Sequence, residues 1–511
     1  MEDEQPETPS PGVTNPAGEQ HDAAATPMDA NVPNGVLDPV LYRLATVVVA
    51  EFDSVAAAYL AHDGYKYVPK RQIQKVDKFD SGWPNVSSYK SDTEMPAHGN
   101  LFGETEQTLQ PLAYKDLTSM PALFAYIESN PDLYASLRVP NAEGKHTEVA
   151  EFMYRYTVTE LPRSIYDRAM ALGLPLHSPA VVDLYKARET SWLARELPYE
   201  LVVPLLLTDL QIDDTFHIDA DARFEKLSDD DLRAMFADYD LSGVPQPLAL
   251  AAKYALVVKM PPLTNTGETA LAFLPEPDPD LTKVRSVCEA LRIVSSASIG
   301  WARVFRRPLG WTHRWKDALP VFSIQHTSRE YPAAFDDYGW LKKGGTVATD
   351  ELDKLPAVVA AITNASAKAK LAARRLSMAD VRDDTDDQLV DACIGLEALL
   401  GQEGAELSYR VAVRAAALLS SKKDNPLDAG VVFDLARKVY NRRSELVHGS
   451  VSGKHESFTF PNGTTMATHY LAVYLLREVL HERLLRVDNW KVEDLDALVL
   501  QKLNQPAAAS T

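Results

Sequence analysis

The sequence predicts a multidomain protein in which an α+β N-terminal domain precedes an all-α helical bundle, behind a disordered N-terminal tail. Three observations predict this fold class. The 511 residues are too many for one ordinary hydrophobic core. Apolar residues make up 46% of the chain, which suits globular packing. Their spacing also changes from mixed to helical near residue 281.

The domain boundaries follow changes in composition along the chain. We expect a disordered acidic tail (1–36), an α+β domain of unknown function (37–280), a helix with a connecting region rich in Pro and Gly (281–349), the helical bundle (350–490), and a terminal helix and tail (491–511). The first 40 residues hold eight acidic residues and no Lys or Arg. Such a tail cannot bury enough apolar surface to offset the entropy lost on ordering.

Charge and cysteine content limit the classes of function. A net charge of −20 opposes non-specific binding to nucleic acid or anionic lipid. Cys288 and Cys393 lie in helical patterns and leave no disulfide framework and no zinc cluster. No uninterrupted apolar run approaches the roughly 20 residues of a membrane span, and the N-terminal sequence lacks the layout of a signal peptide. We therefore expect a cytoplasmic protein without membrane contact, metal or cofactor.

The α+β domain shows a mixture of helical and strand patterns. Residues 37–62 begin with apolar residues at helical spacing. Apolar residues alternate over Phe216–Phe224, which predicts one half-buried strand. Ser228 followed by Asp231 predicts the capped start of a helix, and Tyr254–Met260 predicts another strand. The chain shows no phosphate-loop glycine pattern, no Gly-x-Ser-x-Gly and no His-Glu-x-x-His motif.

Helical spacing begins at Thr282 and, after a predicted loop over Arg307–Thr346, dominates the rest of the chain. Short connections between most of these helices favour antiparallel neighbours and therefore a bundle. The expected helices are Asp350–Ala379, Thr385–Leu400, Ala405–Ser420, Leu427–His448, Thr464–Val487 and Val492–Leu503.

One segment of the bundle, VYNRRSELVHGS (Val439–Ser450), combines two adjacent arginines with a histidine. On an ideal helix Arg442 and Arg443 flank the apolar stripe rather than face solvent. Gly449 is a natural residue to follow a helix, so the helix should end at His448.

Five residues separate Arg443 from His448, so their side chains point about 140° apart on an ideal helix. They cannot converge unless the last turn unwinds or a second copy of the chain supplies the partner across a two-fold axis. The alternative is a structural helix end whose cations interact with the helix dipole.

Three blocks in this order resemble the Apea-like branch of the HEPN superfamily: LAARRLSMADVRDDTDDQLVDACIGLEALLG (Leu371–Gly401), ELSYRVAVRAAALL (Glu406–Leu419) and VYNRRSELVHGS. The resemblance covers about residues 350–490 and gives no support to residues 37–345. It implies an all-α bundle, usually dimeric, in which the arginine–histidine motifs of two protomers face each other. Many members are metal-independent endoribonucleases, and several are linked to toxin–antitoxin pairs and to antiviral defence in prokaryotes. Others have lost catalysis and only bind RNA or protein.

By position, the resemblance makes Arg443 the motif arginine and His448 the motif histidine. The residue after the arginine is commonly Asn, Asp or His in the family, and here it is Ser444. Glu397 matches the acid of the LEALL helix. It either forms an ion pair with Arg410 or Arg443, or orients the catalytic arginine.

Arg442 and Tyr440 are supporting candidates, and Tyr440 either touches RNA or packs in the core. In an endoribonuclease the 2′-hydroxyl of RNA attacks its own phosphate, His448 moves protons and Arg443 stabilises the charged transition state. The products are a 2′,3′-cyclic phosphate and a 5′-hydroxyl. Residues 422–450 hold six basic and four acidic side chains, which permits a local RNA site.

Two other hypotheses remain open. The bundle either binds RNA or a partner protein without catalysis, or serves only as a structural dimerisation module. A toxic nuclease also needs restraint, so an inhibitory or sensor partner is a further expectation, and a stress or phage-defence role follows from the resemblance alone.

A second basic stretch, WARVFRRPLGWTHRWK (Trp301–Lys316), interleaves cations with aromatic residues. Charge and stacking of this kind hold single-stranded nucleic acid, so Arg306, Arg307, Arg314 and Trp311 are candidate RNA-binding residues. The alternative is a helix end and loop packed against the bundle.

Overall fold

The structure is a computed structural model that describes residues 32–61, 63, 72–78, 84–90, 102–103, 112–113, 117–137, 148–236, 248, 251–267, 278–316, 319–336, 345–402, 406–420, 427–449, 453–485 and 492–504. The prediction of a disordered tail falls on residues 1–36, of which 1–31 lie outside the described residues.

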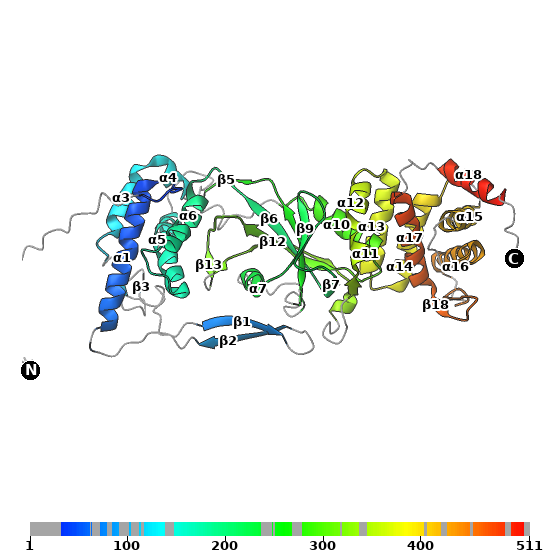
Figure 1. Ribbon diagram of the computed structural model, residues 1–511, viewed down its shortest axis with the longest axis horizontal. Helices are drawn as coiled ribbons and strands as arrows, with labels where there is room; N and C mark the ends of the chain where they lie inside the picture. The colour runs from blue at the N-terminus through cyan, green and yellow to red at the C-terminus, as the bar shows by residue number, and fades with distance from the viewer. Residues whose placement is uncertain are drawn as a thin grey trace, which may run out of the picture.

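The protein is elongated, with a group of helices at one end, a six-stranded sheet in the middle and a second group of helices at the other end (Figure 1). This arrangement confirms the predicted order of an α+β region followed by a C-terminal helical region. The N-terminal helices are α1 (Pro39–Ala61), α3 (Met120–Ser129), α4 (Pro131–Ser136), α5 (Glu148–Leu172) and α6 (Pro179–Leu193).

The N-terminal helices share a core of their own, which includes Phe52, Tyr154 and Trp192. Among the described residues, α1 is the one helix long and apolar enough to cross a membrane, with a hydropathy of 1.6. One face of α1 nevertheless packs into this core through residues such as Leu41 and Val48, which are fully buried. The expectation of a protein without membrane contact therefore stays a prediction.

The central sheet is antiparallel in the order β15-β12-β6-β10-β9-β8. Its strands are β6 (Tyr199–Leu205), β8 (Thr215–His217), β9 (Ala222–Lys226), β10 (Tyr254–Lys259), β12 (Trp301–Pro308) and β15 (Ser323–Glu330). The short strand pairs are β1 (Gln72–Lys78) with β2 (Pro84–Lys90), β3 (Phe102–Gly103) with β4 (Leu112–Ala113), β5 (Glu196–Leu197) with β11 (Leu263–Thr264), β7 (Thr208–Leu210) with β16 (Gly345–Val347), β13 (Trp315–Lys316) with β14 (Leu319–Pro320), and β17 (Ser457–Thr459) with β18 (Thr465–Ala467).

Both faces of the sheet are buried. Alternate side chains of a strand point to opposite faces, and in β6 Leu201 and Val203 join the largest core while Val202 joins a smaller one. The smaller core includes Leu232 and Met235 of α7 (Asp229–Phe236). Capping by Ser228 and Asp231 is confirmed, because each side chain accepts a hydrogen bond from the other residue's backbone N–H.

The helical region contains α10 (Thr282–Val294), α11 (Thr349–Leu352), α12 (Leu355–Thr363), α13 (Ala367–Val381), α14 (Thr385–Leu400), α15 (Leu407–Leu419), α16 (Ala429–Val447), α17 (Thr468–Leu485) and α18 (Val492–Leu503). The largest core runs without a break from Tyr199 of the sheet to Leu495 of α18. The sheet and the C-terminal helices therefore form one packed body.

Two sequence predictions on strands and loops were wrong. The expected single strand over Phe216–Phe224 is a hairpin of β8 and β9, since the Asp219 carboxylate accepts the backbone N–H groups of Asp221 and Ala222 and turns the chain. The expected loop over Arg307–Thr346 contains β15, and β12 ends at its start. Two strands of the central sheet therefore come from residues 281–349, which were assigned to a helix and a connection.

Two predictions on helices also needed correction. The expected helix Asp350–Ala379 is three helices, because Pro356 marks the start of α12 and Ser366 caps α13 by accepting the N–H of Ala369 at 3.3 Å. The expected helix start at Thr464 is instead the β17–β18 hairpin, and α17 begins at Thr468.

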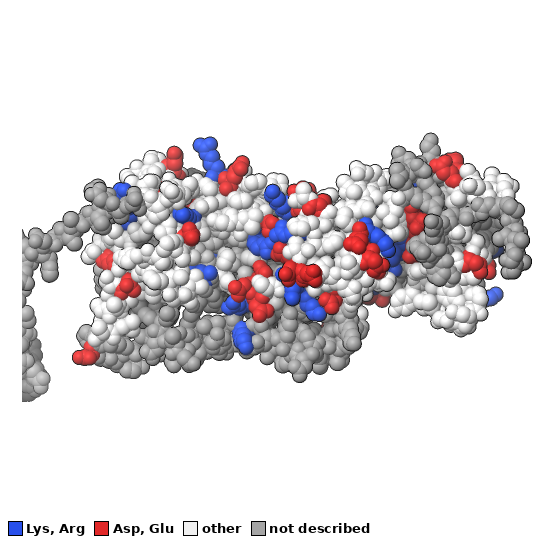
Figure 2. All heavy atoms as spheres, in the orientation of Figure 1, with Lys and Arg blue, Asp and Glu red and all other residues white. Residues whose placement is uncertain are grey.

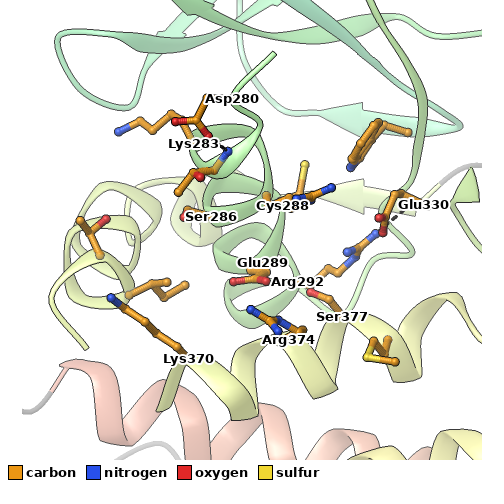
Figure 3. A pocket seen from close by; sticks show the side chains of 16 residues that line it. Asp280, Lys283, Ser286, Cys288, Glu289, Arg292, Glu330, Lys370, Arg374 and Ser377 are labelled. Atoms are coloured by element: carbon orange, nitrogen blue, oxygen red, sulfur yellow. Dashed lines mark hydrogen bonds between the residues drawn. The ribbon is translucent and has the colours of Figure 1, made fainter. Parts of the chain in front are cut away.

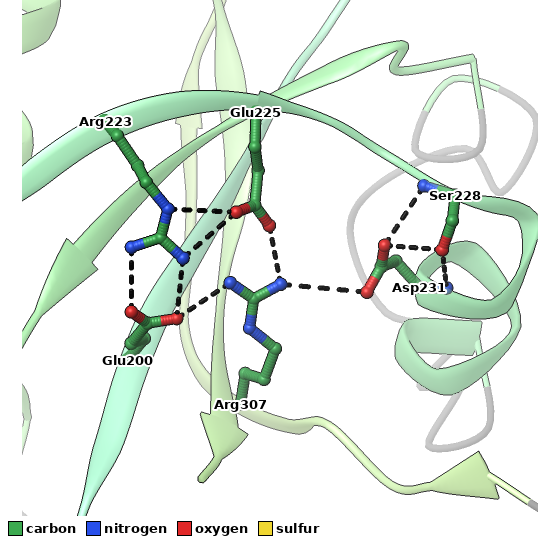
Figure 4. Close-up of polar contacts among 6 residues, drawn as sticks. All are labelled: Glu200, Arg223, Glu225, Ser228, Asp231 and Arg307. Carbon is green, nitrogen blue, oxygen red and sulfur yellow. Dashed lines mark hydrogen bonds and ion pairs between the residues drawn. The ribbon is translucent and has the colours of Figure 1, made fainter. Parts of the chain in front are cut away.

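On the face shown in Figure 2, Lys and Arg side chains lie interspersed with Asp and Glu over the middle of the molecule. A network of charged side chains joins the sheet to α7, where Arg307 lies 3.7 Å from Asp231 (Figure 4). Arg307 of β12 lies 2.7 Å from Glu200 of β6 and 2.5 Å from Glu225 of β9, and Arg223 of β9 lies 2.8 Å from Glu200. Burial would raise the pKa of Glu200, but the two arginines outweigh it and hold that pKa below its usual value.

Replacing Glu200 by alanine should destabilise the sheet by about 1–3 kcal/mol, because Arg223 and Arg307 lose one of the two carboxylates that they share and keep Glu225. The Glu200 pKa is lowered by folding, so its contribution is present at neutral pH and is lost as the pH falls through that lowered value. Thermal unfolding at pH 7 and at acid pH measures both effects.

The control is Lys253→Ala, which removes an exposed ion pair of 3.4 Å and should change stability by less than about 0.5 kcal/mol. Equal effects of the two substitutions, or a difference that grows in acid, would contradict this account of the network.

Candidate functional site

The C-terminal end of α16 has the predicted geometry. The Asp428 carboxylate accepts the N–H of Val431 at 2.8 Å and starts the helix, which runs to Val447. His448 is the C-cap residue and is exposed. Gly449 follows in the left-handed conformation, at φ +66°, where a side chain would be strained. The predicted helix end is therefore confirmed.

Arg442 links α16 to its surroundings. Its guanidinium nitrogens lie 3.3 Å from Asp386 of α14, 3.5 Å from Glu445 and 3.6 Å from Glu456 beside β17. The Arg442 side chain is 13% exposed. Three carboxylates around one half-buried guanidinium give Arg442 a structural position.

Arg443 is held more loosely. Its Nη2 lies 3.7 Å from Oε1 of Glu397 on α14, which is an ion pair but too long for a hydrogen bond. The Nε of Arg443 and the Oε1 of Glu397 are both buried without a hydrogen-bond partner. Of the two partners expected for Glu397, the structure places Arg443 there and not Arg410. The Arg443 side chain as a whole is nevertheless 35% exposed, so part of it faces solvent.

The hydroxyl of Tyr440 and the thiol of Cys393 border this ion pair. Tyr440 of α16 is 6% exposed, and its hydroxyl is buried without a hydrogen-bond partner. Burial raises the pKa of Tyr440, and burial together with Glu397 raises the pKa of Cys393 on α14. Both groups therefore stay uncharged at neutral pH. The Tyr440 ring packs in the core and leaves little surface for RNA.

Within one chain the structure keeps the two motif residues apart. Arg443 faces Glu397, whereas the His448 ring is at the exposed end of the helix, and no interaction among the described residues joins them. Ser444 is exposed, and its carbonyl accepts the N–H of His448 at 3.1 Å. This arrangement agrees with the offset of about 140° that an ideal helix gives.

Two histidines near this helix end were not among the sequence-predicted candidates. His455, before β17, has its Nε2 3.7 Å from Oε1 of Glu445. Burial lowers the pKa of His469 at the start of α17, against the charge of Asp386, and its ring lies 4.2 Å from that of Tyr470. Sequence spacing gave no signal for either residue, because the β17–β18 hairpin brings them to the site.

The first half of the second basic stretch is β12 of the central sheet, and Trp311 and Arg314 lie in the connection between β12 and β13. Trp311 is 2% exposed and donates its indole N–H to the carbonyl of Pro198 at 2.7 Å. Arg306 is also 2% exposed and lies over the Trp311 ring, while Arg307 belongs to the network with Glu200. Of the four candidate RNA-binding residues, only Arg314 is exposed. The other three offer no open surface for base stacking.

The same stretch contains a second arginine–histidine pair, Arg307 and His313, whose spacing is one residue longer than that of Arg443 and His448. Burial beside Arg188 and Arg306 lowers the pKa of His313 to about 3, so its ring is neutral at neutral pH. This copy has no accessible acid–base group.

Comparisons with known proteins found no matching family model, no similar curated protein and no similar solved structure. The HEPN resemblance rests on the three sequence blocks and stays a prediction.

The two adjacent arginines should differ in their effect on stability. Arg442→Ala removes three carboxylate contacts and should cost about 1–2 kcal/mol, whereas Arg443→Ala breaks one long ion pair and should cost less than about 1 kcal/mol. Chemical denaturation of the two variants beside wild type measures this, and each variant is the matched control for the other. A larger loss for Arg443→Ala would contradict a loosely held Arg443.

Proposed function

We propose that the protein is a metal-independent endoribonuclease of the HEPN type, in which two copies of the chain build the active site. The observation that supports this most is the end of α16. It presents an arginine with unused donors and, on another side, an exposed histidine at the helix C-terminus.

The proposed chemistry needs only RNA, solvent water and these side chains. As the 2′-oxygen attacks the adjacent phosphorus, the proton of the 2′-hydroxyl passes to solvent water and the bond to the 5′-oxygen breaks, which forms a 2′,3′-cyclic phosphate and a 5′-hydroxyl. Arg443 donates hydrogen bonds to the phosphate oxygens as negative charge develops on them. His448 gives a proton to the leaving oxygen. DNA lacks the 2′-hydroxyl and should resist this reaction.

A homodimer supplies the missing geometry, because the His448 of one copy can lie beside the Arg443 of the other across a two-fold axis. Apolar surface at this end of the bundle supports the expectation. Val447 of α16, Met466 of β18 and Tyr470 of α17 are 57%, 43% and 63% exposed, respectively. Exposed apolar side chains gathered at one end of a molecule favour a protein interface.

The second candidate is a bundle that binds RNA or a partner protein without catalysis. The Arg443–Glu397 ion pair favours it, because the carboxylate competes with phosphate for the guanidinium. The Ser444 side chain cannot act as an acid or base near neutral pH, which also favours the non-catalytic candidate. In either case we expect the protein to act in the cytoplasm, under the control of an inhibitory or sensor partner, in a stress or phage-defence role.

Cleavage of a fluorogenic RNA in the presence of EDTA tests the proposal. Arg443→Ala and His448→Ala should each lower the rate by about 100-fold or more, because each removes a separate part of the transition-state stabilisation. Arg437→Ala is the control, since this exposed arginine lies on the same helix. The matching DNA should remain intact, and the RNA product should carry a cyclic phosphate.

Three outcomes are informative. RNA binding without cleavage by the wild type would favour the non-catalytic module. Neither binding nor cleavage of RNA would contradict the nuclease and the RNA-binding module, and would leave the module that binds a partner protein. Equal cleavage by wild type and both variants would show that the active site lies elsewhere or that a contaminating nuclease is present.

A further inference from the structure

A second site lies far from the end of α16, where the sheet meets the helical region (Figure 3). It is a cavity of about 910 Å³ bordered by α10, α12 and α13, with Trp301 of β12 and Glu330 of β15 in its wall. Ligand pockets commonly have volumes of roughly 300–1,000 Å³, so this one can hold a molecule of mononucleotide size.

The cavity has the opposite charge balance to the chain. Five basic and three acidic side chains line it, whereas the whole chain carries −20. Arg285 and Arg292 come from α10, and Lys370 and Arg374 stand one turn apart on α13. Residues four apart share a face of a helix, so two helices direct cations into one space.

Two buried polar groups in the wall have unused hydrogen-bonding capacity. Arg292 is 2% exposed and donates from Nη2 to the carbonyls of Ile299 at 2.9 Å and Glu330 at 3.1 Å, yet its Nε has no partner. Ser377 is 8% exposed, and its hydroxyl has no partner either. Buried polar groups are normally satisfied, and both of these residues line the cavity.

The acidic side chains in the cavity weaken its positive field only in part. Figure 3 shows the Glu289 carboxyl between α10 and α13, close to Arg292 and Arg374. Burial raises the pKa of Glu289, although Arg374, Arg292 and Arg285 pull in the other direction. A carboxyl that gains a proton more readily opposes an incoming anion less.

We propose that this cavity binds a small phosphate-bearing ligand of mononucleotide size. Guanidinium groups bind phosphate oxygens through paired hydrogen bonds, and lysine adds a point charge. Trp301, Ile362 and Met378 give the cavity an apolar wall against which an uncharged part of the ligand packs. The site is independent of the proposed ribonuclease activity.

Fluorescence titration of the full-length protein with a methylanthraniloyl derivative of ATP tests the proposal. We expect saturable binding that unlabelled ATP and pyrophosphate displace and that adenosine, which lacks phosphate, does not. The double variant Lys370→Ala/Arg374→Ala should bind about tenfold more weakly or worse, since it loses charge-assisted hydrogen bonds. Both side chains are exposed, so their removal leaves the core intact, as circular dichroism will verify.

Two control variants locate the binding. Lys368→Ala changes an exposed lysine of α13 outside the cavity lining and should not alter the affinity. Arg443→Ala should not alter it either, which separates this cavity from the end of α16. No saturable binding of the ATP derivative, equal affinity of the double variant, displacement by adenosine, or loss of binding in Arg443→Ala would each overturn the proposal.

Discussion

An α-helix turns through about 100° per residue, and this constraint decides what the end of α16 can do. Arg443 turns toward α14 and meets Glu397, while His448 caps the helix on another side. The left-handed Gly449 ends the helix at once, so no further turn brings the imidazole back. One chain therefore presents the guanidinium and the imidazole in two directions. A reaction that needs both at one phosphate needs two chains.

The continuous core gives this helix end its support. The largest cluster of buried apolar residues runs from the sheet through α10 to the last helices, so the α+β region is not a separately tethered unit. Polar contacts follow the same route: Arg477 of α17 donates to the carbonyl of Arg292 at 2.8 Å and pairs with Asp380 of α13. The phosphate-binding cavity that we propose lies between the helices joined by these contacts.

Local sequence patterns predicted the features that local physics determines. The capping pair Ser228 and Asp231, the helix Thr385–Leu400 and the end of α16 before Gly449 all depend on residues a few positions apart, and all three were predicted correctly. The apolar position of Glu397 also indicated a cationic partner, which proved to be Arg443.

Features that depend on distant pairing escaped prediction. The basic and aromatic residues of β12 suggested a nucleic-acid surface, because the sequence does not show that Arg307 finds its carboxylates 107 and 82 residues away. The buried Trp311 depends in the same way on a carbonyl of a distant segment. His455 and His469 flank the β17–β18 hairpin, whose second strand falls within the helix predicted from Thr464.

The central claim is that Arg443 of one chain acts with His448 of another. Mixing the inactive variants Arg443→Ala and His448→Ala under conditions that exchange subunits tests it most directly. Random exchange makes about half of the dimers mixed, and each mixed dimer regains one complete site out of two, so about a quarter of the wild-type RNA cleavage should return. No recovery of cleavage in a mixture shown to contain mixed dimers would contradict a site shared between two chains.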